Sequence, residues 1–123
     1  MEYTINLTTV KMAFATDWVG VRSGREYNKW GKTGLTPVPG EKVASPTIKE
    51  SPLSIECRVK EIIKLGTHDM FISDVLNVRV DSEFMDDTGK FNLEKAGLIA
   101  YSHGHYFSLG EIIGKFGFSV KKK

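Results

Sequence analysis

Residues 53–80 read LSIECRVKEIIKLGTHDMFISDVLNVRV and carry the clearest β-strand pattern of the 123-residue chain. In the first half, polar residues alternate with an apolar set made of Leu53, Ile55, Cys57 and Val59. Asp74 interrupts the second half, where we expect one face to hold Met70, Ile72, Leu76, Val78 and Val80. The link KLGTHD is short and contains Gly66, so the pattern predicts two strands joined as an antiparallel hairpin.

The chain opens with another alternating stretch, in which one face holds Tyr3, Ile5 and Leu7. This alternation predicts a half-buried strand. The strand would begin almost at Met1, with no turn or cap before it. Core strands seldom begin so abruptly, so we expect that a piece upstream of this strand is missing.

Helical spacing follows the first strand. Thr8 or Thr9 can cap a helix, and Gly20 is expected to end it. The apolar face of this helix would hold Val10, Phe14, Trp18 and Val21. Trp18 is therefore interpreted as a core residue rather than as part of a binding site.

The rest of the chain is less regular at first and then rich in strands. A second short helix is expected between Arg25 and Trp30. Residues 34–52 contain all four prolines and predict a long irregular segment, of the kind that is functional or lies across another surface. Helical signals precede residue 34 and strand signals dominate after residue 52. One β-rich α+β domain over residues 1–123, with a barrel-like sheet, is the predicted fold.

Composition narrows the functional classes. With 17 basic and 15 acidic residues, the net charge of +2 gives no footprint for nucleic acid. The one basic run, Lys121 to Lys123, is expected to be a solvated tail. Cys57 is the single cysteine, so no intrachain disulfide can form, and it is interpreted as a buried thiol. No apolar run approaches a membrane span and no secretion signal opens the chain, so we expect a cytoplasmic protein without a membrane partner.

No metal site and no familiar nucleotide-binding loop are expected. Walker and Rossmann glycine patterns and the nucleophile elbow are all missing from the sequence. His103 and His105 would share a face on a strand and, with His68, offer three imidazoles. No acidic or thiol partner stands at ligand spacing, so the prediction is that they hold no metal.

Two segments are candidates for ligand binding. Ser23, Gly24 and Arg25, followed by Lys29, offer a hydroxyl, a backbone amide and two cations that suit a phosphate; the alternative is a solvated loop. The stretch YSHGHYFSLG at residues 101–110 offers aromatic surfaces with glycines that let backbone approach a flat ligand. The alternative there is core packing of the aromatic side chains, with exposed histidines.

A histidine in the hairpin link is a third candidate. His68 stands beside Asp69 and could act as a proton donor or hydrogen-bond partner at a redox site. The alternative is a histidine that caps a turn.

Three stretches of the chain resemble the flavin reductase-like proteins, including flavoredoxins. TINLTT…AFATDWVGVRSGREYNKWGKTGLTP resembles the middle of these proteins. SPLSIECRVKEIIKLGTHDMFISDV resembles their next strand pair, and AYSHGHYFSLGEIIGKFGFSVKKK resembles their C-terminus. The resemblance is collinear over nearly the whole chain and covers the C-terminal two-thirds of the family domain.

The resemblance implies a split β-barrel that binds FMN without a covalent link, as a homodimer. It implies hydride transfer from NAD(P)H to the flavin, or a flavoredoxin-like carrier that exchanges electrons with a redox partner protein. Position by position, it places Ser23, Gly24 and Arg25 near the FMN phosphate or ribityl chain, with Lys29 as a second cation there. It places His68, the candidate catalytic residue, towards the nicotinamide or flavin. The residues that would line the flavin pocket are Tyr101, His103 and Tyr106.

The chain also departs from the family pattern. Ser73-Asp74 stands where relatives often carry Gly-Glu, and Asn28-Lys29-Trp30 stands where they often carry Asp-Lys-Phe. The larger departure is at the front, because relatives carry several strands before the one that begins at Glu2. Those strands supply barrel edges and flavin contacts, so an N-terminally truncated domain that binds no flavin is the third alternative.

Overall fold

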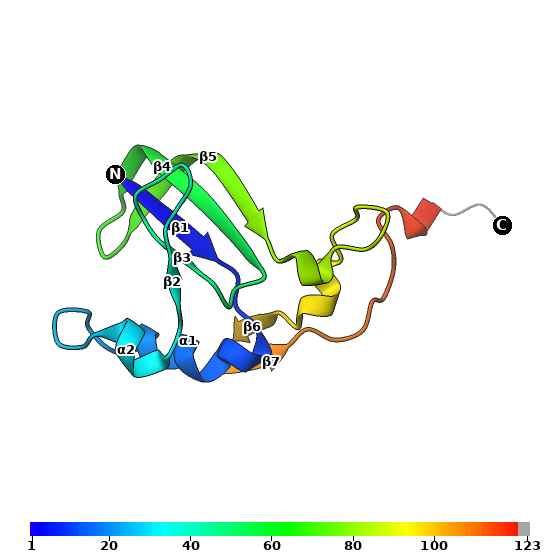
Figure 1. The fold of residues 1–123 in the computed structure, drawn as a ribbon, viewed down its shortest axis with the longest axis horizontal. Helices are drawn as coiled ribbons and strands as arrows, with labels where there is room; N and C mark the ends of the chain where they lie inside the picture. The colour runs from blue at the N-terminus through cyan, green and yellow to red at the C-terminus, as the bar shows by residue number, and fades with distance from the viewer. Residues whose placement is uncertain (121–123) are drawn as a thin grey trace.

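The centre of the molecule is an antiparallel sheet of three strands in the order β1-β4-β5 (Figure 1). The computed structural model describes residues 1–120, and the predicted tail at 121–123 lies outside them. The strands are β1 (Glu2–Asn6), β4 (Leu53–Lys64) and β5 (Asp69–Val80). The predicted opening strand and the predicted hairpin are both confirmed, and the hairpin is longer than the alternating pattern indicated.

Irregularities in the hairpin correct the predicted face of β5. Glu56 pairs with Asn77 and Cys57 pairs with Val75, which leaves Leu76 as an extra residue on its strand. Side chains alternate between the two faces of a strand, so one extra residue exchanges the faces beyond it. Val75 therefore takes the position opposite Cys57, and the prediction that residues 70–80 keep one apolar face is wrong. The thiol of Cys57 is buried, as predicted.

Two short helices follow β1. After η1 (Val10–Met12) comes α1 (Ala13–Gly20), which ends at the predicted glycine. Thr9 is the residue before η1, but its side chain makes no capping hydrogen bond. The expected apolar face is not buried: Phe14 is 83% exposed, and Met12 is the buried residue of this region. Trp18, predicted to be a core residue, is half-buried and packs against Tyr27 and Arg22, so the predicted apolar face forms no core.

The second helix lies slightly later than expected. It is α2 (Lys29–Thr33), and the side chain of Asn28 accepts a hydrogen bond from the amide of Gly31 at its start. Gly34 ends it with a φ of 73°, a left-handed conformation that glycine adopts without strain.

The long segment after α2 covers the polar face of the sheet. It contains a short antiparallel pair, β2 (Pro37–Val38) with β3 (Thr47–Ile48), and is otherwise irregular, as predicted. Figure 1 shows it passing in front of β1. Side chains on this face are buried beneath it, among them Ser54 and the fully buried Glu56.

The last part of the chain forms a second hairpin and then leaves the body. Two turns of 3-10 helix, η2 (Ser82–Phe84) and η3 (Leu93–Ala96), lead into β6 (Ile99–Ser102) and β7 (His105–Ser108). The chain then runs outwards to a last turn, η4 (Phe118–Val120). The predicted β-rich α+β fold is confirmed. Among residues 1–120, no helix has the length and apolar character needed to cross a membrane.

Candidate functional site

The loop between α1 and α2 presents one free cation. The hydroxyl of Ser23 accepts a hydrogen bond from the amide of Arg25 at 3.1 Å, and the Ser23 carbonyl accepts the amides of Glu26 and Tyr27. These bonds hold residues 23–27 as a tight turn. Arg25 is exposed, and within residues 1–120 its guanidinium makes no ion pair or side-chain hydrogen bond. A charged group held on a turn and free of partners is available to an anionic ligand.

Lys29 has a partner inside the chain. Its ammonium donates a hydrogen bond of 2.7 Å to the carbonyl of Val19, near the end of α1. The last carbonyls of a helix lack partners within the helix and carry partial negative charge, which attracts such a cation. Lys29 therefore links α2 to α1. Its ammonium group already has a partner in the chain, whereas the guanidinium of Arg25 has none within residues 1–120.

Aromatic rings and an arginine gather beside this turn. The rings of Trp18 and Tyr27 meet edge to face at 5.5 Å, and the guanidinium of Arg22 lies 4.3 Å from the centre of the Trp18 ring. Arg22 also donates to the Trp18 carbonyl at 3.2 Å. Arg22 and Tyr27 are absent from the sequence-based prediction, which ended the helix at Gly20, before either residue.

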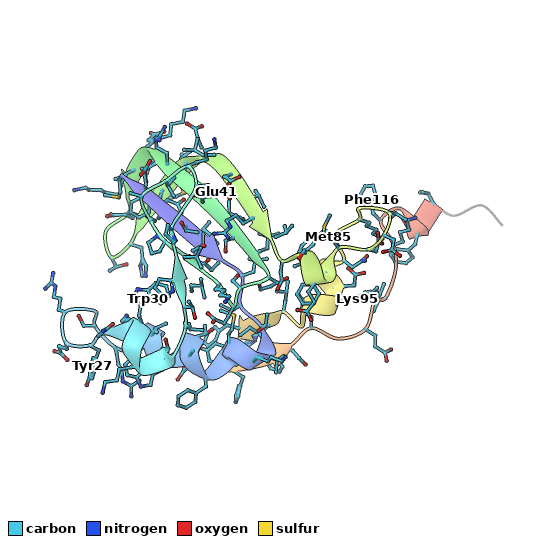
Figure 2. The ribbon with its side chains drawn as sticks, viewed as in Figure 1. Tyr27, Trp30, Glu41, Met85, Lys95 and Phe116 are labelled. Carbon is cyan, nitrogen blue, oxygen red and sulfur yellow. The ribbon has the colours of Figure 1, made fainter. Side chains whose placement is uncertain are left out.

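A small apolar hollow lies next to Lys29. Its volume is about 290 Å³, and α1, α2 and the segment through β3 line it with Val19, Lys29, Trp30, Thr33, Leu35 and Ile48. Figure 2 shows Trp30 and Tyr27 at the same end of the molecule. The hollow is small compared with the usual range for cofactor sites, about 300–1,000 Å³, so it would hold part of a large ligand.

The predicted aromatic segment forms the β6–β7 hairpin. Tyr101 and Tyr106 are cross-strand partners whose rings meet edge to face at 5.2 Å. The hydroxyl of Tyr106 donates to Asp17 on α1 at 3.1 Å. Loss of solvent contact and this hydrogen bond raise the pKa of Tyr106 above its usual value. Tyr101 is 67% exposed, so its ring is available to a flat ligand and is not packed into a core.

The three histidines have local partners and do not meet. In the β6–β7 turn, Nδ1 of His103 lies 2.7 Å from the Ser102 hydroxyl, and Nδ1 of His105 lies 3.1 Å from the His103 carbonyl. His68 lies in the β4–β5 turn, with Nδ1 3.0 Å from the Thr67 hydroxyl. Across residues 1–120, no three His, Cys, Asp or Glu side chains come together in a metal-binding arrangement.

Helix α1 joins two of the three predicted parts of the site. Asp17 binds the aromatic hairpin through Tyr106, and Val19 binds Lys29 behind the turn that carries Arg25. No hydrogen bond or aromatic contact in the described residues links His68 to either part. The chain therefore brings the cation and the tyrosines to one helix, and leaves the histidine on a separate hairpin.

The joined residues suit a ligand with an anionic end and a flat aromatic end. Arg25 offers a charge for a phosphate, and the Tyr101 ring offers a surface for stacking. These groups match FMN in kind. The nearby hollow is small and open, so within residues 1–120 it does not enclose a flat ring system.

Comparisons with known proteins agree with this description. The sequence profile described as the flavin reductase like domain matches residues 1–110. A protein of Archaeoglobus fulgidus without an assigned function is 31% identical over 107 residues, which is 87% of this chain and 59% of the relative.

Two solved flavoredoxin structures share the fold. The flavoredoxin of Desulfovibrio vulgaris (Miyazaki F) superposes with a TM-score of 0.85 at 30% identity. The flavoredoxin of Methanosarcina acetivorans superposes with a TM-score of 0.82 at 26% identity. Each match covers 96% of this chain and 64% of the flavoredoxin. The chain thus spans about three-fifths of the length of these proteins.

Proposed function

The chain belongs to the flavin reductase-like family, and from this premise we propose that it binds FMN and passes hydride from NAD(P)H to the flavin. The second candidate is a flavoredoxin-like carrier, in which bound FMN exchanges electrons with a redox partner protein. The likeness to two flavoredoxins, at 30% and 26% identity, supports this second candidate. Both functions require the same flavin site.

The observation that carries the proposal is that α1 contacts both parts: Asp17 accepts the hydrogen bond from Tyr106 of the hairpin, and Trp18 packs against Tyr27 of the turn that carries Arg25. Arg25, with the Ser23 hydroxyl and the Gly24 amide, would hold the phosphate by charge-assisted hydrogen bonds. Tyr101 would pack against the ring, and the hydrogen bond from Tyr106 to Asp17 would fix the hairpin that carries it. FMN, when bound, supplies the two-electron redox chemistry, and the protein supplies position and electrostatics.

Three of the proposed residues have weaker support from geometry. The bond from Lys29 to Val19 makes it a positioning residue for the Arg25 turn. His103 forms the hairpin turn, and its imidazole would reach the ligand from the turn. His68 is proposed as the proton donor on the family resemblance, because its described contacts do not connect it to the tyrosines.

The assembly and the location belong to the same proposal. We expect a homodimer, because one copy does not enclose a flavin. A cytoplasmic location follows from the sequence, since a single cysteine gives no sign of an oxidising compartment.

An absorbance scan of the purified chain, desalted after incubation with excess FMN, tests flavin binding. Flavin bands that remain after desalting support the proposal, and a protein spectrum without them supports the truncated domain that binds no flavin. NADH or NADPH oxidation with FMN then favours the reductase. Bound flavin that is reduced by a partner protein, and not by nicotinamide, favours the carrier.

Substitution of Arg25 tests the phosphate contact. Arg25→Ala should weaken FMN binding by roughly 1.5–3 kcal/mol, or about 10- to 150-fold, as for other charge-assisted hydrogen bonds. Lys32→Ala is the matched control, because it removes an exposed cation of α2 from the same end of the molecule. Equal FMN dissociation constants for the two variants in a fluorescence titration would remove Arg25 from the site.

A further inference from the structure

A polar pocket lies on the covered face of the central sheet. Its volume is about 300 Å³, and its walls are β3 with the residues that follow it, the start of β4, and the end of β5 with the turn after it. Every wall residue lies between positions 47 and 82, and only Ile48 also lines the apolar hollow beside Lys29. We name it the Arg79 pocket. Its volume is at the lower end of the range for small-molecule sites, about 300–1,000 Å³, which suits a small ligand.

The strand register brings an arginine to this pocket. Arg79 pairs with Ser54 across β4 and β5, and two residues earlier Asn77 pairs with Glu56. Alternate residues of a strand share a face, so Arg79 lies on the same polar face as the buried Glu56. Its Nη1 atom donates a hydrogen bond of 2.9 Å to the hydroxyl of Thr47 on β3. Thr47 is only 2% exposed, so this bond holds the guanidinium against a fixed wall.

The acids near this guanidinium are engaged elsewhere. Glu56 accepts three backbone amides and a side-chain amide, and Asp81, on the pocket wall, accepts the amide of Glu83 at 2.9 Å. Neither carboxylate forms an ion pair with Arg79 within residues 1–120. A guanidinium has five N–H donors, and the bond to Thr47 uses one of them. The half-buried charge of Arg79 is therefore available to an anion in the pocket.

Two further groups of the pocket suit a phosphate. Lys49 adds a second cation and Ser82 adds a hydroxyl; both residues are exposed, and neither side chain has a hydrogen-bond partner within residues 1–120. Ser51 and Ser54 also line the pocket, but their hydroxyls already donate to other parts of the chain. The planar fork of an arginine matches two oxygens of a phosphate, and a lysine adds a point charge.

We infer that the Arg79 pocket binds a single phosphate group, as free phosphate or as the phosphate of a small phosphorylated molecule. Arg79 offers two parallel donors, and Lys49 and Ser82 contact the remaining oxygens. Asp81 carries the one negative charge on the wall and weakens the binding. This site is separate from the flavin contacts proposed around Arg25, so it does not depend on the proposed function.

An NMR titration of the ¹⁵N-labelled full chain with inorganic phosphate, at neutral pH and constant ionic strength, tests the site. The backbone amides of Asp81 and Ser82 should shift and reach saturation. Arg79→Gln should raise the phosphate dissociation constant about 10-fold or more, because a charge-assisted pair of hydrogen bonds is lost. Asp81→Asn should lower the constant several-fold, since it removes the opposing charge and keeps an oxygen for the Glu83 amide. Shifts that do not saturate would overturn the inference.

A matched pair of lysine variants keeps the test valid if Arg79→Gln folds poorly. Lys49→Gln should raise the constant several-fold, whereas Lys60→Gln, at an exposed position of β4, should leave it nearly unchanged. Both variants lose the same charge from exposed positions. Equal effects would show general attraction of anions to the surface, and would contradict a defined pocket.

Two more ligands identify the source of the phosphate. Tighter binding of methyl phosphate than of inorganic phosphate supports a phosphorylated small molecule, and the opposite order supports free phosphate. FMN affinity that is unchanged in Arg79→Gln supports a site separate from the flavin. FMN that displaces phosphate from the pocket, with an affinity that Arg79→Gln lowers, would overturn that separation.

Discussion

Glu56 shows how a single charged side chain can be fully buried and still stabilise the fold. Its Oε1 atom accepts the amides of Glu41, Lys42 and Val43 at 2.8, 3.0 and 3.3 Å, and its other oxygen accepts the side-chain amide of Asn77. A buried carboxylate is costly unless such donors replace water. Burial alone would raise the pKa of Glu56, but these hydrogen bonds outweigh it and hold the pKa below its usual value.

Glycine at position 40 lets the loop of residues 41–43 close around the Glu56 carboxylate. A Cβ atom at Gly40 would lie 2.4 Å from the Val43 carbonyl oxygen and 2.8 Å from Oε1 of Glu56. No side chain fits at that distance, so the loop can close on the carboxylate only with glycine. The Glu56 contact thereby fixes the segment that covers the polar face of the sheet.

Glu56→Gln should lower the free energy of unfolding by roughly 2–3 kcal/mol at neutral pH, because hydrogen bonds to a charged acceptor are lost. The folded-state pKa lies below the unfolded value. The wild-type contribution is therefore present above the unfolded pKa of about 4.5 and disappears as the pH falls through the folded pKa. Urea unfolding at fixed protein concentration should show that the free energies of unfolding of the wild type and of Glu56→Gln become equal in acid. Glu61→Gln, at an exposed position of β4, is the control and should remain close to wild type throughout.

At the scale of elements, the β6–β7 hairpin depends on its turn and on its contact with α1. His103 and Gly104 connect the paired residues Ser102 and His105, with φ angles of 50° and 79°. Positive φ at both central residues is the type I′ turn that matches the twist of a hairpin. The sequence analysis placed His103 and His105 on one face of a strand, which is wrong because His103 lies in the turn, and its positive φ appears only in the structure.

Two substitutions distinguish the role of His103 in the turn from its proposed contact with the ligand. His103→Asn should keep or slightly raise stability, because asparagine followed by glycine is the preferred pair in this turn. Gly104→Ala should destabilise the hairpin by about 1 kcal/mol, since a Cβ atom is strained at positive φ. Thermal unfolding measures both effects. Weaker FMN binding by the fully stable His103→Asn protein would assign His103 to the site, and unchanged binding would leave it a turn residue.

The contact between the β6–β7 hairpin and α1 can be followed through the pKa of Tyr106. Desolvation first, and then the hydrogen bond to Asp17, raise the pKa of Tyr106. Asp17→Asn should return this pKa towards the ordinary value near 10, since the amide carries no negative charge to oppose the tyrosinate. NMR of the labelled tyrosine Cζ carbon follows the change. Glu26→Gln, in the exposed loop, should leave it in place, and an unchanged Tyr106 titration in Asp17→Asn would show that the two elements do not meet in solution.

At the scale of the whole molecule, the chain has the fold of its family but buries few apolar side chains. Among residues 1–120, the buried apolar side chains are Met12, Val43 and Cys57, together with Pro52. Several large apolar groups of the sheet remain in solvent, and so do Phe14 and Val21. In the homodimer proposed above, contact with a second copy would bury more apolar surface and add to the stability of the fold.

The thermal unfolding midpoint should therefore rise with protein concentration. For a dimer that unfolds to monomers, each tenfold increase in concentration adds about 1.4 kcal/mol to the apparent stability. Calorimetry over a hundredfold range of concentration should show a shift of several degrees. A midpoint that is independent of concentration would mean that the single copy is stable without its partner.

Much of the fold could be predicted from the sequence because local patterns carry it. The period-two alternation in residues 53–60 and the short link with Gly66 predicted the β4–β5 hairpin, which is present. Gly20 ends α1, and the irregular segment with four prolines lies across another surface, as expected. Helix boundaries were less well predicted, because α2 depends on the Asn28 cap as much as on its composition.

The candidate site could be predicted only in part. Arg25 and Tyr101 are exposed, and for Tyr101 this excludes the core packing that the sequence had left open as an alternative. The bond between Lys29 and Val19, and the contact of Trp18 with Arg22, depend on how α1 and α2 pack, which no local pattern encodes. Membership of the family at residues 1–110 supports these residues as a set but does not test them one by one.

By itself, the sequence determined the β4–β5 hairpin, the β-rich class and the family, because periodicity, turn residues and collinear similarity are properties of the chain. Tertiary structure alone decided which surfaces are covered. One extra residue, Leu76, reversed the faces along β5, and the loop around Glu56 buried the polar side of the sheet. Burial depends on what packs against a strand, so the apolar pattern could not show that Phe71, Val75 and Val78 of β5 stay exposed within residues 1–120.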